Sequence, residues 1–262
     1  MSQPQVVTST QIATEAIIFP DENLWSNEPP LESDRHREQI DLLIRLIKWW
    51  WRDSLRDSSA SRTDFYAAGN LTVYYSPNQK TSEYFRGPDF FVVLGTEKKD
   101  RRSWVVWHEG GKYPNVIIEL LSDSTAAVDR GFKKELYQNV WRVPVYFWFS
   151  PDTLEFAGFC LVGGQYQEIV PTPQGWLWSQ QLELYVGIHQ RQLRFFTPEG
   201  MLVPLPEEDA QRKAKQAQQR AEQAEQSIRN AIPQMLAMGL SVEQVAQVLN
   251  LSVEQVQQLN IG

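Results

Sequence analysis

The sequence has little cysteine, no long uninterrupted apolar run and no excess of positive charge. Its single cysteine, Cys160, excludes an internal disulfide and fits a reducing compartment. The apolar run LLIRLIKWWW is short and is interrupted by Arg45 and Lys48, so no membrane span is expected. The N-terminal stretch MSQPQVVTSTQIATEAIIFP lacks a basic segment followed by an apolar one. No signal peptide is therefore expected, and the predicted location is the cytoplasm.

The overall charge is acidic, with a formal net charge of -7 and an isoelectric point of about 5.1. This excludes a basic field over the whole protein of the kind that attracts nucleic acid. The chain nevertheless has 262 residues, of which 42% are hydrophobic and 12% aromatic. Those values allow a sizeable core in one large domain, or in one domain with a smaller module.

Residue patterns divide the chain into four predicted parts. Residues 1–30 are expected to be irregular, and residues 31–206 to form an α/β domain. Within that domain, LESDRHREQIDLLIRLIKWWWRD predicts a helix capped by Ser33 or Asp34. The segments PDFFVVLG, NVIIELLS and VPVYFWFSP predict buried strands, and TAAVDRGFKKELYQNV predicts a crossover helix between the last two. A hairpin is expected around Gly163 and Gly164, so the domain should contain a mixed sheet flanked by helices.

The last two parts are predicted to be helical. In residues 207–230, apolar residues, mostly alanine, recur at alternating spacings of four and three, which indicates a weak coiled-coil seam or a solvated helical arm: Ala210, Ala214, Ala217, Ala221, Ala224 and Ile228. Residues 231–262 repeat SVEQV at Ser241 and Ser252, a capping-box pattern that begins short helices in a helix-turn-helix-like tail. The last helix, VEQVQQLN, has no Lys or Arg, which favours packing or partner binding over DNA reading.

A carboxylate inside a buried strand raises the question of function. The run NVIIELL is apolar except at Glu119, and a charge in such a place must be compensated. Asp89 begins the strand upstream of it, and two neighbouring strands would bring both carboxylates to one point. A shared Mg²⁺ or Mn²⁺ ion would compensate them, with Lys133 or Lys134 of the crossover helix close by. Such a site suits phosphodiester hydrolysis.

Several segments together resemble a known family. They are ESDRHREQ, FYAAGNLTVYYSP, FRGPDFFVVLG, YPNVIIELLSDST, DRGFKKELY, VPVYFWFSP and LVGGQY, between about Leu31 and Pro206. They are similar to the cyanobacterial branch of the Uma-type restriction endonuclease family of the PD-(D/E)XK nuclease superfamily. The resemblance implies a restriction-endonuclease-like mixed sheet and a metal-dependent endonuclease acting on DNA. It also implies that Asp89 and Glu119 are the catalytic acids and the metal ligands.

The catalytic lysine departs from the pattern of the superfamily. Leu121 stands two residues after Glu119, where a lysine is usual, and the family pattern D-R-x-x-K-x-x-x-Y matches instead Asp129, Arg130, Lys133 and Tyr137. Lys133 is therefore the implied catalytic lysine. Five residues are secondary candidates: Lys134, Ser122, Glu32, His36 and Glu38. For Ser122 a turn-capping role is favoured, and for His36 a solvated place in the first turn of its helix.

Two other functions remain open from the sequence. The acidic isoelectric point favours a catalytically silent, nuclease-derived module that binds nucleic acid or regulates, because phosphate contacts dominate DNA affinity. A sugar-processing enzyme would also use paired carboxylates, but it would not need the lysine. The expected partners are DNA and, through the alanine seam or the core, a second copy of the chain.

Overall fold

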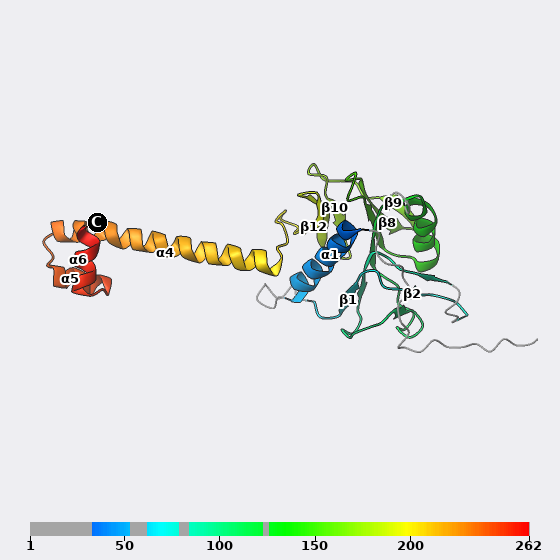
Figure 1. Ribbon diagram of the computed structural model, residues 1–262, viewed down its shortest axis with the longest axis horizontal. Helices are drawn as coiled ribbons and strands as arrows, with labels where there is room; N and C mark the ends of the chain where they lie inside the picture. The colour runs from blue at the N-terminus through cyan, green and yellow to red at the C-terminus, as the bar shows by residue number, and fades with distance from the viewer. Residues whose placement is uncertain (1–32, 53–61, 79–83, 123–125, 262) are drawn as a thin grey trace, which may run out of the picture. The chain divides into compact units, whose positions relative to one another are not determined.

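The computed structural model describes residues 33–52, 62–78, 84–122 and 126–261 (Figure 1). The chain divides into two compact units, Met1–Val203 and Pro204–Gly262. The first unit contains both helices and mixed strands, and the second is helical, so the predicted α/β class with a helical tail is confirmed. The finer division into four parts stays a prediction. No helix in the described ranges is long and apolar enough to cross a membrane.

The first described helix, α1 (Asp34–Arg52), covers the expected segment. Of the two predicted caps, Ser33 is the one observed, because the amide of His36 donates to its Oγ at 3.3 Å. The side chain of Gln39 fastens the helix to a distant strand. It donates to the carbonyl of Leu193 at 3.0 Å and accepts from the amide of Leu193 at 2.8 Å. The apolar face of α1 is buried, with Leu43, Leu46 and Ile47 fully enclosed.

The main sheet has six strands in the order β1-β4-β6-β7-β8-β9. They are β1 (Phe65–Ala68), β4 (Phe90–Leu94), β6 (Val116–Leu120), β7 (Val145–Phe149), β8 (Phe156–Val162) and β9 (Gln165–Glu168). Strands β6 and β7 are parallel and every other pair is antiparallel. All five residues of β6 and of β7 are buried, as the continuous apolar runs predicted. The predicted hairpin is confirmed as β8 and β9.

Two smaller sheets complete the first unit. One has the order β3-β2-β5 and consists of β3 (Phe85–Arg86), β2 (Val73–Tyr74) and β5 (Trp104–Val105). The other consists of β10 (Leu177–Ser179), β11 (Leu184–His189) and β12 (Gln192–Phe196). The residue patterns did not predict the strands β1, β3 and β11. In β11 the pattern is interrupted by Gly187, which the fold needs because a Cβ there would lie 2.2 Å from the ring of Trp176.

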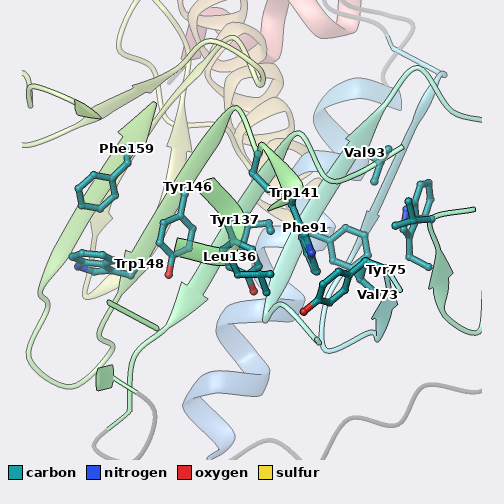
Figure 2. Packing of buried hydrophobic residues seen from close by; sticks show 14 of the residues in the cluster. Val73, Tyr75, Phe91, Val93, Leu136, Tyr137, Trp141, Tyr146, Trp148 and Phe159 are labelled. Carbon is teal, nitrogen blue, oxygen red and sulfur yellow. The ribbon is translucent and has the colours of Figure 1, made fainter. Parts of the chain in front are cut away.

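The crossover between β6 and β7 is helical, but it is not a regular α-helix. It runs through α2 (Ala126–Val128), a π-helical turn over Asp129–Lys133, α3 (Lys134–Leu136) and a second π-helical turn over Tyr137–Trp141. One face of this segment packs on the sheet. Figure 2 shows Leu136, Tyr137 and Trp141 in one buried cluster with Tyr146 of β7. Because side chains alternate along β6, Ile117 and Glu119 face this cluster, while Ile118 faces the opposite side.

The second unit consists of α4 (Pro206–Ala237), α5 (Val242–Leu249) and α6 (Val253–Ile261). The end of α4 and the two short helices share a small core of Ile232, Val245, Ala246 and Val256. Both predicted capping boxes are confirmed. Ser241 Oγ accepts from the amide of Gln244 at 3.3 Å, and Ser252 Oγ accepts from that of Gln255 at 3.1 Å. Within this unit, the alanine positions from Ala210 to Ala224 are exposed.

Candidate active site

Asp89 and Glu119 meet because the strands that carry them are paired. Strands β4 and β6 are antiparallel with Phe90 opposite Ile118, so the next position outward places Asp89 beside Glu119. The amide of Asp89 donates to Oε2 of Glu119 at 3.3 Å. In return, Oδ2 of Asp89 accepts from the amide of Leu120 at 2.7 Å. The predicted convergence of the two acids is therefore present, and backbone groups hold both of them.

Glu119 has no exposed surface, and two side chains of the crossover helix compensate it. The ammonium of Lys133 lies 3.1 Å from Oε2, and the hydroxyl of Tyr137 donates to Oε1 at 2.6 Å. An ion pair combined with a charge-assisted hydrogen bond is what a buried carboxylate requires. The charge of Glu119 is thus balanced from within the protein.

The crossover helix supplies Asp129, Lys133 and Tyr137 at spacings of four residues, which brings them to one face. Lys133 Nζ lies 2.7 Å from Oδ1 of Asp129 as well as beside Glu119, so one ammonium joins two buried carboxylates. Tyr146 of β7 donates its hydroxyl to the backbone carbonyl of Asp129 at 2.9 Å and fixes the start of the π-helical turn. Single π-helical turns inside helices occur frequently at functional sites.

Asp89, Glu119, Asp129 and Lys133 form an acidic cluster, which carries more negative than positive charge. Three carboxylates (Asp89, Glu119 and Asp129) surround one ammonium (Lys133), so the formal charge is -2 when all four are ionised. Burial raises the pKa of Glu119 to about 7; Lys133 opposes the rise, the charge of Asp89 adds to it, and the Tyr137 hydroxyl opposes it. Burial also raises the pKa of Asp89, against the opposing effect of Lys133. The two acids therefore take up protons readily when no further cation is present.

Lys133 stays positively charged in this setting. Burial by itself would lower the pKa of its ammonium, but Glu119, Asp129 and Asp89 outweigh that effect and raise the pKa. Burial raises the pKa of Tyr137 well above its usual value, and the neighbouring charge of Glu119 raises it further, so this residue remains a hydrogen-bond donor. The site consequently has one fixed cation, one fixed donor and two acids with variable charge.

The residues fit a divalent cation in charge and ligand type. An excess of two negative charges, with raised carboxyl pKa values, is what a doubly charged ion relieves. Mg²⁺ binds through one or two carboxylates, keeps several waters and completes its shell with substrate phosphate. Within the described ranges, no group of three or more His, Cys, Asp or Glu side chains is arranged to hold a metal ion. A cation would therefore depend on Asp89, Glu119 and water.

Lys134, the alternative lysine, lies in another environment. Its ammonium is 3.4 Å from the ring centroid of Phe159 and 5.3 Å from that of Trp148. Burial lowers the pKa of Lys134, and the charge of Glu168 on β9 opposes the change. Lys133, the lysine that the resemblance implied, therefore faces Glu119, and Lys134 faces the strands β7 and β8.

The other secondary candidates lie in different parts of the chain. Ser122 follows β6 and its carbonyl accepts from the amide of Ala126 at 3.0 Å, which fits the favoured role in a turn. Glu38 is exposed on α1. His36 is buried with 7% of its surface exposed, and its Nδ1 lies 3.0 Å from Ser33 Oγ, so the expected solvated position is wrong. Glu32 lies outside the described residues.

A glycine allows the strand of Asp89 to come close to its neighbour. The backbone of Gly69 passes so near Asp89 that a Cβ at position 69 would lie 2.6 Å from the Asp89 carbonyl oxygen. It would also lie 2.2 Å from the side chain of Ile40 on α1. The amide of Asn70 donates to the same Asp89 carbonyl at 3.2 Å. Gly69 therefore helps to set the position of Asp89, although it carries no chemistry of its own.

The structure adds Asp129 and Tyr137 to the site residues expected from the sequence. Both belong to the pattern around Lys133, but neither was given a role at the acids. The available signal was the regular spacing of four residues from Asp129 to Lys133 and from Lys133 to Tyr137. Arg130 of the same pattern points elsewhere and forms an exposed ion pair with Glu155 at 2.5 Å.

Comparisons with known proteins give the family of this chain. No curated protein matches it. One solved structure that matches is that of a putative nuclease belonging to DUF820 from Anabaena variabilis ATCC 29413, with 12% sequence identity and a TM-score of 0.40. That match covers 58% of this chain and 76% of the other. A family model described as "putative restriction endonuclease" matches residues 11–195, which is most of the chain and includes every residue of the acidic cluster. The chain therefore belongs to this restriction endonuclease family, Uma2.

Proposed function

We propose that this chain hydrolyses phosphodiester bonds of DNA in a reaction that depends on Mg²⁺ or Mn²⁺. The observation that carries the proposal is the convergence of Asp89, Glu119 and Lys133, with two backbone-held carboxylates beside one buried ammonium. Paired acids and a lysine are suited to phosphoryl chemistry, in which catalysis is mostly positioning and charge stabilisation. The name of the family supports a nuclease, and the choice of DNA as substrate is part of the proposal.

Asp89 and Glu119 are the residues that would hold the cation. When bound, the cation would polarise a phosphoryl oxygen and lower the pKa of a coordinated water. Asp89 is suited to this because the amide of Leu120 holds its carboxylate in place through one oxygen, Oδ2. Glu119 would keep its hydrogen bond from Tyr137, which holds the carboxylate in one orientation.

Lys133 acts on the substrate. Its ammonium remains protonated, and its side chain retains 16% of its exposure while Glu119 has none. Of Lys133 and Glu119, Lys133 is therefore the charged residue that meets an incoming phosphate. There it donates hydrogen bonds to the phosphate oxygens on which negative charge increases as water attacks phosphorus and the bond to the leaving oxygen breaks. Asp129 positions Lys133 through the contact of 2.7 Å and does not itself touch substrate.

A catalytically silent binding or regulatory module is the second candidate. It is favoured because the charge of Glu119 is already compensated by groups of the protein. The two carboxylate oxygens contact Lys133, Tyr137 and the amide of Asp89. The acidic isoelectric point also weakens any general attraction to DNA. Calorimetric titration with Mg²⁺ and Mn²⁺ separates the two candidates, because a silent module with a self-balanced site gives no heat of metal binding.

Cleavage of supercoiled plasmid tests the leading function directly. The wild-type protein is expected to nick or linearise plasmid with Mg²⁺ or Mn²⁺ and to be inactive with a chelator. Glu119→Gln and Asp89→Asn, which keep the size of each side chain, should both abolish the metal-dependent activity. The matched control is Glu155→Gln, because Glu155 is an exposed carboxylate paired with Arg130 outside the cluster. Cleavage that persists in either cluster variant would contradict the proposed function.

A further inference from the structure

A groove of about 840 Å³ opens beside the helix that carries Lys133. One wall comes from the crossover helix through Phe132, Leu136 and Val140, which follow one another at spacings of four residues. The opposite walls come from the region of β2 and β3 and from the segment after β5, and aromatic rings dominate them: Tyr75, Tyr84, Trp107 and Tyr113. The groove is therefore lined mainly by flat apolar surfaces.

The rim of the groove exposes rings that the fold does not bury. Phe132 and Tyr84 are each 51% exposed, and Val140 is 52% exposed. Tyr84 also adopts a φ of 58°, a left-handed conformation that is unfavourable for a bulky residue. Grouped exposed apolar side chains mark binding surfaces more often than isolated ones do.

The floor of the groove is joined to the buried core by packed rings. Tyr75 packs edge-on against Trp141 with ring centroids 5.1 Å apart, and Figure 2 shows the two side chains in the buried cluster. Trp141 packs against Tyr137 at 4.9 Å, and Tyr137 donates to Glu119. A chain of packed rings thus joins the floor to the acidic cluster.

Arg86 is the only charged residue among the described residues that line the groove. Its guanidinium lies 5.0 Å from the ring centroid of Phe132, and its Nη1 donates to the carbonyl of Phe85 at 2.6 Å. The groove therefore combines several ring faces with one cation. A surface that follows a duplex backbone would need many cations, because affinity for duplex DNA comes mainly from neutralised phosphates.

Two separate stretches of chain each contribute a residue to the groove and a nearby residue to the acidic cluster. Phe132 immediately precedes Lys133, and Arg86 is three residues before Asp89. Three residues of fully extended chain span at most about 11 Å. A ligand that reaches from the cluster into the groove is therefore of nucleotide size.

We propose that the groove receives an unpaired nucleobase of a DNA strand whose phosphate lies at Asp89, Glu119 and Lys133. The base stacks on the exposed rings of Phe132 and Tyr84, and Arg86 faces the adjoining sugar-phosphate. An unpaired base offers both ring faces for such stacking, whereas a base inside a duplex has its faces covered by its neighbours. The inference rests on the proposed function for the placement of the phosphate, and it adds that the substrate is single-stranded or locally unpaired at this position.

Binding measured without catalysis tests the inference. Fluorescence anisotropy in chelator would compare a labelled thymidine oligomer of about ten nucleotides with an abasic oligomer of the same length and charge. The wild-type protein is expected to bind the base-containing strand more tightly. Phe132→Ala should weaken that binding by about 5- to 150-fold, the range for the loss of one stacking ring, and should leave abasic binding unchanged. Phe132→Trp should restore it.

The matched control is Val128→Ala. Val128 is 47% exposed on the same helical segment but is not among the groove residues, so this variant should bind both strands as wild type does. Phe132 is half exposed, so its substitution should leave the melting temperature unchanged. Equal affinity of the wild-type protein for base-containing and abasic strands would overturn the inference. Preference for a uridine RNA oligomer over the DNA strand would also overturn it, as would conversion of a dimer to a monomer by Phe132→Ala in light scattering.

The binding measurement tests the groove, and the plasmid cleavage assay tests the proposed function, so the two can fail independently. Base preference that depends on Phe132 supports the groove as a nucleobase site even in a protein that cleaves nothing. Metal-dependent cleavage without any base preference supports the hydrolysis and overturns the groove.

Discussion

The ammonium of Lys133 lies 3.1 Å from Oε2 of Glu119, although the two residues are fourteen positions apart in the sequence and belong to a helix and a strand. The next residue, Lys134, places its ammonium 3.4 Å from the ring centroid of Phe159 instead. One step along the helix therefore separates a buried ion pair from a contact with an aromatic ring. This difference makes the two lysines a matched pair for experiment.

Substitution of the two lysines should have unequal effects on cleavage. Lys133→Ala is expected to reduce single-turnover cleavage by about 10²-fold or more, because it removes a donor to the charge that develops on phosphate. Lys134→Ala should cost far less and mainly increase the sensitivity to salt. Lys133→Arg should also be poor, since a guanidinium fork does not replace a compact ammonium between Glu119 and Asp129. Equal losses at positions 133 and 134 would refute the assignment.

Stability should fall as the pH rises through the range in which Glu119 ionises. Its pKa is raised from 4.5 to about 7, so between these values the folded protein binds more protons than the unfolded chain. The stabilising contribution is complete below about pH 4.5 and is lost as the pH approaches 7. The raised pKa of Asp89 acts in the same direction. Thermal melts between pH 4.5 and 8 should show this slope in the wild-type protein.

Two comparisons check the origin of that slope. Glu119→Gln should flatten it, because the amide does not titrate, whereas Glu155→Gln should leave it unchanged. Mg²⁺ should raise the melting temperature more at pH 8 than at pH 5, since the cation binds the ionised carboxylates. A slope that is the same in Glu119→Gln and in wild type would assign it to other groups.

Tyr137→Phe should alter the pH dependence of activity as well as stability. The hydroxyl donates to Glu119 at 2.6 Å and lowers the pKa of that carboxyl, so its removal should shift the ionisation of Glu119 to higher pH. Loss of a hydrogen bond to a charged group should also cost about 1.5–3 kcal/mol of unfolding free energy. The measurement is the pH profile of single-turnover cleavage, together with denaturant unfolding.

Tyr146→Phe is the control for Tyr137→Phe. Tyr146 is also buried, but its hydroxyl donates to the backbone carbonyl of Asp129 and not to Glu119. It should therefore lower stability without a comparable shift of the pH profile. If both variants shift the profile equally, the hydrogen bond from Tyr137 does not set the pKa of Glu119.

The alanine seam of α4 should pair two chains, because its positions are exposed within a helix of 32 residues. Light scattering should find a dimer for the full chain and a monomer after deletion of the residues beyond Pro206. Ala217→Leu with Ala221→Leu should strengthen the dimer by adding apolar area at the seam, and glutamates at the same positions should break it. Glutamates at Gln219 and Gln226, on the opposite face, should have no effect. A monomeric full chain would contradict the seam.

The local features of this protein follow from its sequence. Continuous apolar runs identify β6 and β7 as strands covered on both faces, and the serines before α5 and α6 identify their caps. The spacing of four between Asp129, Lys133 and Tyr137 also assigns them to one helix face, and the resemblance to the family pattern singled out Lys133 over Lys134. These features depend on periodicity and on contacts a few residues apart, which a single chain displays directly.

The tertiary structure decided which distant groups meet. Pairing of β4 with β6 brings Asp89 to Glu119, and the packing of the crossover helix places Lys133 and Tyr137 beside Glu119. It also buries His36, which its place in a first helical turn suggested would be solvated. The aromatic groove combines residues from β3, the chain after β5 and the crossover helix, so no single stretch of sequence contains its pattern. Strand register and helix packing set these contacts, and both depend on the whole core.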